Sequence, residues 1–234
     1  MKKAIFLYDY TGLIAKPWLD AGYECWSFDG QHPEGITREG NYVKVGMWFY
    51  PDKTDQQAMD VFMLVGPNVV HVFGFPECKD LAVSGATHFK KKLAENPNVQ
   101  INAANLAKLV EKVAHLYGCA WAAENPVSVL STLWRAPDFY FNPFDYGGYL
   151  PKNDKHPEYP EYIKPRDAYP KKTCIWCGNG YKQPKKKPVE VESGYSQQHR
   201  KLGGKSLKTK NIRSATPRGF AIANFLANGE SDVY

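Results

Sequence analysis

The chain has 234 residues, of which 43% are hydrophobic and 14% aromatic, enough to bury the core of one domain or two small ones, which excludes a disordered tail. Its five cysteines are too few and too scattered for a disulfide scaffold, and their odd number leaves at least one thiol free, so we expect the reducing cytoplasm. The net charge of +6 is uneven, because residues 1–150 carry 13 Lys and Arg against 16 Asp and Glu, whereas residues 151–234 carry 17 against 8.

The first predicted elements form a βαβ unit. Residues 3–9 (KAIFLYD) are an apolar run that ends in an acid, which is typical of a buried strand. Residues 13–21 suit a short helix stopped by Gly22, and residues 23–28 (YECWSF) return as a second strand that ends at Asp29.

The next stretch predicts a further strand–helix–strand sequence. An extended segment is expected within residues 42–50, and Thr54 can cap a helix that runs to about Leu64. Residues 69–75 (VVHVFGF) are β-branched or aromatic and carry no charge. They predict a central parallel strand buried on both faces.

The clearest helical pattern follows Asn102. Apolar residues recur there at the i, i+3, i+4, i+7 spacing as far as Tyr117, and Gly118 closes the helix. Residues 119–123 are then another apolar strand, directly before Glu124.

Strands that alternate with helices predict an α/β fold with a Rossmann-like, mostly parallel sheet. Ligands of such a sheet bind beyond the carboxyl ends of its strands. Asp9, Asp29, Cys78 and Glu124 all fall at or just beyond such an end. We therefore expect one crevice to hold all four.

The amino-acid composition changes after residue 150. Residues 151–170 are rich in proline and tyrosine and predict a long surface loop. Residues 173–177 (TCIWC) predict one more short strand, and residues 217–227 predict a final helix whose inward face includes Phe220 and Phe225.

The basic C-terminal third, with a net charge of +9, favours a polyanion partner over a merely solvated surface. Its segment 201–210 interleaves lysines with glycines and hydroxyls, a pattern that suits nucleic acid. The longest apolar stretch, residues 61–75, is interrupted by glycine, proline, asparagine and histidine, so we expect no membrane partner.

Cys78 is the first candidate nucleophile, because a strand-to-helix junction can stabilise a thiolate. The alternative is an ordinary small apolar cysteine; Glu124 at a neighbouring strand end favours the chemical interpretation, since an acid can assist a thiol addition. His71 lies mid-strand and is expected to be a core histidine. Cys174 and Cys177 have the spacing of half a zinc site without a second pair, so we expect no metal.

Several of these residues resemble one family in the order of that family's motifs. Phe75-Pro76-Glu77-Cys78 and Glu124-Asn125-Pro126 resemble the nucleophile loop and the Glu-Asn signature of DNA (cytosine-5) methyltransferases, especially the short bacteriophage-encoded forms. Tyr8 to Gly12 resembles the family's cofactor loop. Lys172-Thr173-Cys174-Ile175-Trp176 is similar to its basic strand, and Arg213 to Arg218 to its closing motif.

The resemblance implies transfer of a methyl group from S-adenosylmethionine to carbon 5 of a cytosine flipped out of DNA. Cys78 would add to carbon 6, Glu124 would hold or protonate N3, Asn125 would position their loop, and Lys172 would approach the flipped base or its phosphate. The implied cofactor-binding residues are Asp9, Tyr10, Thr11, Gly12, Asp29, Pro76 and Thr216.

The resemblance also implies three regions in a chain that we expect to be monomeric. Residues 1–150 would form the catalytic S-adenosylmethionine-binding domain, residues 151–212 a basic, loop-rich region that recognises DNA and lends one strand to the sheet, and residues 213–234 a helix packed on the catalytic domain. The residues expected to bind DNA are Lys201, Lys205, Lys208, Lys210 and Arg213. So short a recognition region predicts a short target sequence.

The chain departs from the family pattern at four places. Its cofactor loop keeps one glycine, Gly12; Glu77 stands where the family has proline and would raise the pKa of the Cys78 thiol; and Cys174 and Pro170 stand where an arginine and a glutamine are expected. These departures leave three alternatives open: a methyltransferase with an altered substrate, an enzyme that transfers another group, or a DNA-binding protein without turnover. A further alternative is an enzyme that uses the same thiol addition on a free pyrimidine nucleotide, although the basic C-terminal third favours a polymer.

Overall fold

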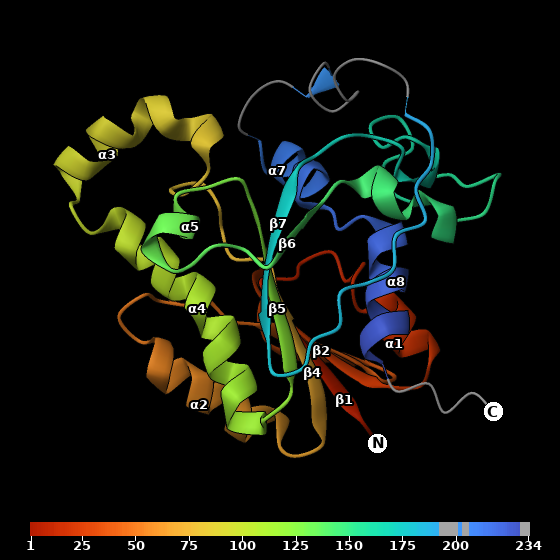
Figure 1. Ribbon diagram of the computed structural model, residues 1–234. Helices are drawn as coiled ribbons and strands as arrows, with labels where there is room; N and C mark the ends of the chain where they lie inside the picture. The colour runs from red at the N-terminus through yellow and green to blue at the C-terminus, as the bar shows by residue number, and fades with distance from the viewer. Residues whose placement is uncertain (192–200, 203–205, 230–234) are drawn as a thin grey trace.

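The computed structural model describes residues 1–191, 201–202 and 206–229 (Figure 1). Its centre is a seven-stranded sheet of order β3-β2-β1-β4-β5-β7-β6. The strands are β1 (Lys3–Leu7), β2 (Glu24–Glu39), β3 (Tyr42–Gly46), β4 (Val69–Gly74), β5 (Ala120–Pro126), β6 (Phe139–Phe141) and β7 (Thr173–Gly178). Neighbours from β3 to β5 pair in parallel, and β7 runs antiparallel to both β5 and β6. The predicted α/β fold with a mostly parallel, Rossmann-like sheet agrees with this arrangement.

Helices cover both faces of the sheet (Figure 1). On one face lie α2 (Thr54–Val65) and α4 (Val99–Tyr117), and on the other α1 (Lys16–Asp20) and α8 (Arg218–Asn228). Successive residues of a strand therefore enter two different cores, as Val72 and Phe73 of β4 do, and both are fully buried. This two-sided burial is the reason why β4 lacks charge.

The ends of the predicted helices agree with the structure to within a few residues. Helix α4 begins four residues before the expected start and stops at Gly118, whose φ of +64° is the left-handed conformation that ends many helices. The expected cap at Thr54 is wrong: Lys53 is the N-cap, and the Thr54 hydroxyl accepts a hydrogen bond from Lys112 Nζ at 2.9 Å.

Strand β2 is longer than the sequence predicted. Residues 25–29 pair with β3 in parallel register, whereas residues 36–39 pair with the same strand in the antiparallel direction, and a turn at Gly40 connects them to it. The sequence placed the end of this strand at Phe28, because the second half is polar and exposed and carries no core signal.

Several short elements were not predicted. They are β6, the 3₁₀ helices η1 (Val83–His88) and η2 (Pro143–Tyr149), and the helices α3 (Phe89–Glu95), α5 (Leu130–Leu133) and α7 (Leu207–Ser214). Figure 1 shows α3, α5 and α7 at the end of the sheet to which the parallel strands run. They therefore surround the region where ligands of such sheets bind.

Residues 151–170 form the irregular loop that the sequence predicted, but the loop does not lie wholly on the surface. This stretch contains the 3₁₀ helix η3 (Pro165–Asp167), and it buries Asp154, His156, Ile163, Asp167 and Tyr169. Ile163 and Tyr169 join Ala215, next to α7, in a third small core. The prolines indicated irregular backbone correctly but did not show that the segment is packed.

No helix within the described ranges is long and apolar enough to cross a membrane.

Candidate active site

The carboxyl ends of β4 and β5 bring Cys78 and Glu124 to one place. Cys78 lies in the loop that follows β4, and Glu124 lies near the end of β5, the next strand in the sheet. Both side chains are half-buried. Glu124 lines a narrow hollow beside these strand ends.

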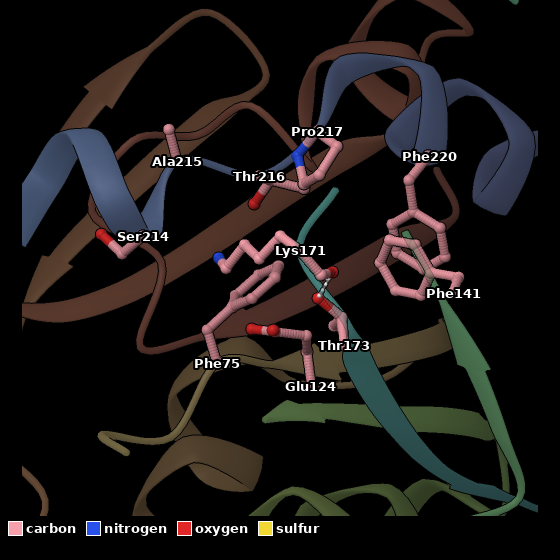
Figure 2. A pocket seen from close by; sticks show the side chains of 10 residues that line it. All are labelled: Phe75, Glu124, Phe141, Lys171, Thr173, Ser214, Ala215, Thr216, Pro217 and Phe220. Carbon is pink, nitrogen blue, oxygen red and sulfur yellow. Dashed lines mark hydrogen bonds between the residues drawn. The ribbon is translucent and has the colours of Figure 1, made fainter. Parts of the chain in front are cut away.

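The walls of this hollow come from segments that are far apart in the sequence (Figure 2). Figure 2 shows the Glu124 carboxylate and the Lys171 side chain directed into the same space, with the Thr216 hydroxyl facing them. The complete lining is Phe75, Glu124, Phe141, Lys171, Thr173, Ser214, Ala215, Thr216, Pro217 and Phe220.

Asn125 ties the loop of Cys78 to β5. Its side chain is buried, and Nδ2 donates a hydrogen bond to the carbonyl of Pro76 at 3.0 Å. Two backbone bonds, from Val83 N to Val127 O at 3.1 Å and from Val129 N to Leu81 O at 3.0 Å, join the same two loops further on. The loop that presents the thiol is therefore fixed to the strand end that presents Glu124.

The thiol and the acid influence each other electrostatically. Burial raises the pKa of Cys78, and the Glu124 carboxylate raises it further, while the Lys171 ammonium lowers it. Burial also raises the pKa of Glu124, and Lys171 again acts in the opposite sense. Relative to free side chains, both pKa shifts are toward the neutral forms of the acid and the thiol, and Lys171 is the cation that can support either anion.

Glu77 has a smaller effect than the sequence predicted. It is exposed, and of the causes that shift the pKa of Cys78 its charge is the weakest. Solvent screening of an exposed carboxylate accounts for this.

Lys171, rather than the expected Lys172, enters the pocket. Its ammonium donates a hydrogen bond to the Arg213 carbonyl at 2.9 Å, at the end of α7. The ammonium of Lys172 lies 4.7 Å from the ring centroid of exposed Tyr140, outside the pocket. Neighbouring residues leave an extended chain on opposite sides, so only one of the two lysines can face Glu124.

An ion-pair network anchors the wall that contains Thr216 and Pro217. Arg218 binds both carboxylate oxygens of Asp154, at 2.8 and 2.6 Å, and reaches Asp167 at 3.4 Å. The Gly219 amide also donates to Asp167, at 3.1 Å. Burial raises the pKa of Asp154, but the hydrogen bonds from Arg218 outweigh it and hold that pKa below its usual range. The start of α8 is therefore attached to the stretch 151–170.

At the end of β1, Asp9 supports its own loop. The carboxylate is buried and accepts hydrogen bonds from the Gly12 amide at 2.9 Å and the Ser27 hydroxyl at 2.8 Å, and burial raises its pKa to about 6. Gly12 has a φ of +68°, and a Cβ there would lie 2.4 Å from the Tyr42 hydroxyl oxygen. Both residues shape the turn, and Thr11 beside them is half-exposed.

Asp29, by contrast, presents a carboxylate at the end of the parallel part of β2. One oxygen accepts from the Gln31 amide at 2.8 Å, and burial raises the pKa of the group. Beside it the Trp48 ring, 64% exposed, covers Gly30, where a Cβ would lie 2.1 Å from the ring. Trp48 was not among the residues predicted to bind cofactor, although its place within the predicted extended segment 42–50 could have indicated it.

The remaining expected cofactor residues lie at two places. Tyr10 is 42% exposed, with its ring centroid 5.6 Å from that of His32. Pro76 is buried and serves as the acceptor for Asn125, while Thr216 lines the pocket. The residues expected to bind cofactor thus divide between the ends of β1 and β2 and the pocket of Glu124.

The residues expected to bind DNA are placed on or near α7. Lys208 and Lys210 are exposed on this helix, and Lys201 donates to the Glu161 carbonyl at 3.0 Å. Arg213 is exposed as a residue, but its guanidinium donates to the Leu202 carbonyl at 2.6 Å. Lys205 lies outside the described residues.

His71 is a core residue, as the sequence predicted. Its ring stacks on Trp18 at a centroid distance of 4.6 Å, it is fully buried, and burial lowers its pKa to about 3. Cys174 is also buried, and burial raises its pKa to about 11. Within the described ranges, no three His, Cys, Asp or Glu side chains are grouped so that they could hold a metal ion.

Comparison with known proteins adds no family: no family model matches the chain, and no curated protein sequence matches it.

Proposed function

We propose that this protein is a DNA (cytosine-5) methyltransferase that uses S-adenosylmethionine and attacks the base with Cys78. The observation that carries the proposal is the meeting of Cys78, Glu124 and Lys171 at the ends of three neighbouring strands, β4, β5 and β7. A nucleophile, an acid and a cation brought near one another in this way suit addition to a pyrimidine.

The chemistry follows from the charges of the site. The Cys78 thiol loses its proton to solvent, its sulfur forms a bond to carbon 6 of cytosine, and the electron pair of the 5,6 double bond moves toward N3. Glu124, whose pKa is raised by burial, donates its proton to N3, and Lys171 lies close enough to stabilise negative charge as it develops. Carbon 5 thereby becomes nucleophilic, and it would accept the methyl group while N3 returns its proton to Glu124; loss of the carbon 5 proton to solvent would then expel the Cys78 thiolate and restore the double bond.

The residues at the ends of β1 and β2 fit a nucleoside cofactor. Asp29 offers an acceptor to ribose hydroxyls, and Trp48 offers an exposed aromatic face beside it for the adenine ring. When bound, S-adenosylmethionine supplies an electrophilic methyl group. The Asp9 side chain holds the intervening loop through Gly12 and Ser27, and Thr11 and Tyr10 form the accessible part of that loop.

One experiment tests the proposal directly. The protein is incubated with DNA and S-adenosylmethionine labelled in the methyl group, and the bases are then separated and counted. We expect label in 5-methylcytosine, with none for Cys78→Ala and full transfer for Cys177→Ala, a control that removes a half-buried thiol elsewhere in the described chain. Label in another base, or unchanged transfer by Cys78→Ala, contradicts the proposal.

The alternative of a DNA-binding protein without turnover is favoured by one observation. The pKa of Cys78 is raised, so the nucleophilic thiolate is scarce in the free protein. Calorimetry separates the two functions, because an enzyme must bind S-adenosylmethionine saturably and a pure DNA-binding protein has no such need.

A further inference from the structure

His32 joins the loop after β1 to the end of the parallel part of β2. It follows Asp29 by three positions in β2 and is 7% exposed. Its Nε2 atom lies 3.1 Å from the Asp9 carbonyl oxygen. A carbonyl oxygen can only accept a hydrogen bond, so Nε2 must carry the proton that it donates there. His32 therefore holds the backbone of the loop that contains four of the expected cofactor residues.

The same imidazole ring contacts the side chain of Tyr10. The two ring centroids are 5.6 Å apart, and the ring planes are inclined by 32°. Tyr10 is 42% exposed, so the ring that His32 contacts is also accessible to a ligand. His32 thus supports both the backbone of the loop and its exposed aromatic side chain.

The loop needs such support because it begins in an unfavourable conformation. Tyr8, directly after β1, has a φ of +59°, in the left-handed region that an aromatic residue rarely adopts. Such a conformation persists only where surrounding contacts hold it. The Tyr8 hydroxyl donates to the Leu106 carbonyl at 2.7 Å, and the Asp9 amide donates to the Phe28 carbonyl at 3.2 Å. His32 adds the contact on the carbonyl side of Asp9, where the exposed part of the loop begins.

The His32 ring is neutral near pH 7. Burial lowers its pKa below the ordinary value; the Asp9 carbonyl and the Asp29 carboxylate oppose this effect, and the Lys44 ammonium reinforces it. S-adenosylmethionine carries a sulfonium cation, which a neutral ring does not repel. The charge of His32 therefore agrees with a place beside such a cofactor.

We propose that His32 is a positioning residue for the cofactor: it holds the loop after β1, and Tyr10 with it, in the conformation that receives the nucleoside. The inference rests on the proposed use of S-adenosylmethionine, and it adds a residue that the sequence pattern did not indicate. Without the bond to Asp9 the loop adopts other conformations as well, and the affinity for cofactor falls with the fraction of molecules that remain competent to bind.

The test measures the affinity for S-adenosylhomocysteine, the demethylated product, by calorimetry, so that no turnover is needed. His32→Gln and His32→Met give side chains of similar length without a ring, and only glutamine retains a donor for the Asp9 carbonyl. We expect binding to weaken by about threefold in His32→Gln, from the lost ring contact, and by about a further tenfold in His32→Met, from the unpaired carbonyl. The controls His115→Gln and His115→Met alter an exposed histidine near the end of α4 and should bind as the wild type does.

Steady-state kinetics supply a readout that a merely structural role would not change. The KM for S-adenosylmethionine is expected to rise by the same factors in the two His32 variants. At saturating cofactor kcat should stay within about twofold of the wild type, because the bound cofactor itself holds the loop. A general loosening of the fold would not separate KM from kcat in this way.

A double-mutant cycle with Tyr10→Ala keeps the inference testable if His32→Met does not fold, which urea unfolding shows. Tyr10 is exposed, so its replacement leaves the core intact. If His32→Gln acts through the ring contact, it should cause no further loss of affinity in the Tyr10→Ala background.

Equal affinities of the wild type, His32→Gln and His32→Met for S-adenosylhomocysteine overturn this inference and leave the methyltransferase proposal standing. The same holds for a full additional loss from His32→Gln in the Tyr10→Ala background, or for a fall in kcat with unchanged KM. Absence of saturable binding of both S-adenosylmethionine and S-adenosylhomocysteine by the unsubstituted protein overturns the proposed function as well.

Discussion

Asn125 donates a hydrogen bond from Nδ2 to the Pro76 carbonyl at 3.0 Å, and this contact joins the strand end of Glu124 to the loop of Cys78. The amide is buried, and its Oδ1 has no hydrogen-bond partner within the described residues. The side chain is therefore held through one contact on the loop of the nucleophile. This is the arrangement expected of a positioning residue.

Asn125→Ala is expected to lower the free energy of unfolding by about 1–3 kcal/mol, because it leaves the Pro76 carbonyl buried and unpaired. It should also lower kcat for methyl transfer by about 10- to 100-fold with little change in KM, since a displaced nucleophile affects chemistry more than binding. Urea unfolding and single-turnover transfer measure the two effects. Gln56→Ala, which removes an exposed amide bonded to Asp60, is the control. A change in KM alone would contradict the positioning role.

The reactivity of Cys78 is expected to respond in opposite directions to its two charged neighbours. Glu124 raises the pKa of the thiol and Lys171 lowers it. Glu124→Gln should therefore move the pH midpoint of Cys78 alkylation by iodoacetamide to lower pH, and Lys171→Met should move it to higher pH. Mass spectrometry of the Cys78 peptide separates this thiol from the other four cysteines. Lys172→Met is the matched control. If it moved the pH midpoint as far as Lys171→Met does, the assignment of Lys171 as the lysine beside Cys78 would be contradicted.

The sequence could not predict that Lys171, and not Lys172, faces Glu124. The strand ends that carry Asp9, Asp29, Cys78 and Glu124 were predictable, because uncharged apolar runs bounded by turns define central strands. The side to which each residue of β7 points depends on its antiparallel register against β5, in which Glu124 lies opposite Ile175. Neither the register nor the partner strand leaves a local signal in the sequence.

The packing of residues 151–170 could not be predicted either, because it also depends on a contact with a distant part of the chain. Prolines and tyrosines predict irregular backbone, but the segment is held by Arg218, which lies about 50 to 64 positions further along the chain. A long-range ion pair of this kind leaves no periodic pattern in the sequence. Its partners become evident only when α8 is placed against the sheet.

Asp9 is expected to make the protein more stable as the pH falls from about 7 to 4. Burial raises the pKa of Asp9 to about 6 in the folded state, against 3.8 for a solvent-exposed aspartate. The folded protein therefore binds the proton more tightly than the unfolded chain, which adds roughly 3 kcal/mol of stability once Asp9 is protonated and removes it as the pH rises through 6. The effect should be visible against Asp9→Asn, which has no such titration.

Urea unfolding of the wild type and Asp9→Asn at several pH values measures this difference. We expect the stability of the wild type relative to Asp9→Asn to increase steadily between pH 7 and 4. Asp20→Asn, at an exposed carboxylate paired with Lys16, is the matched control for the substitution itself. A constant difference between wild type and Asp9→Asn would contradict the raised pKa.

Among the ionic side chains at the pocket wall, removal of Arg218 is expected to lower the free energy of unfolding most. It is 14% exposed and pairs with Asp154 and Asp167, whose side chains are 6% and 1% exposed. Arg218→Met keeps the length of the side chain but leaves two buried carboxylates without their cation, which should cost about 3–5 kcal/mol of unfolding free energy. Lys16→Met, which breaks an exposed pair, should cost less than about 0.5 kcal/mol. Replacing the acids as well, in Arg218→Met/Asp154→Asn/Asp167→Asn, should recover part of the loss, because no unpaired charge then remains buried. Urea denaturation measures all three; a loss below about 1 kcal/mol for Arg218→Met would mean that water reaches the two carboxylates and that the wall of Thr216 and Pro217 is held by apolar packing instead.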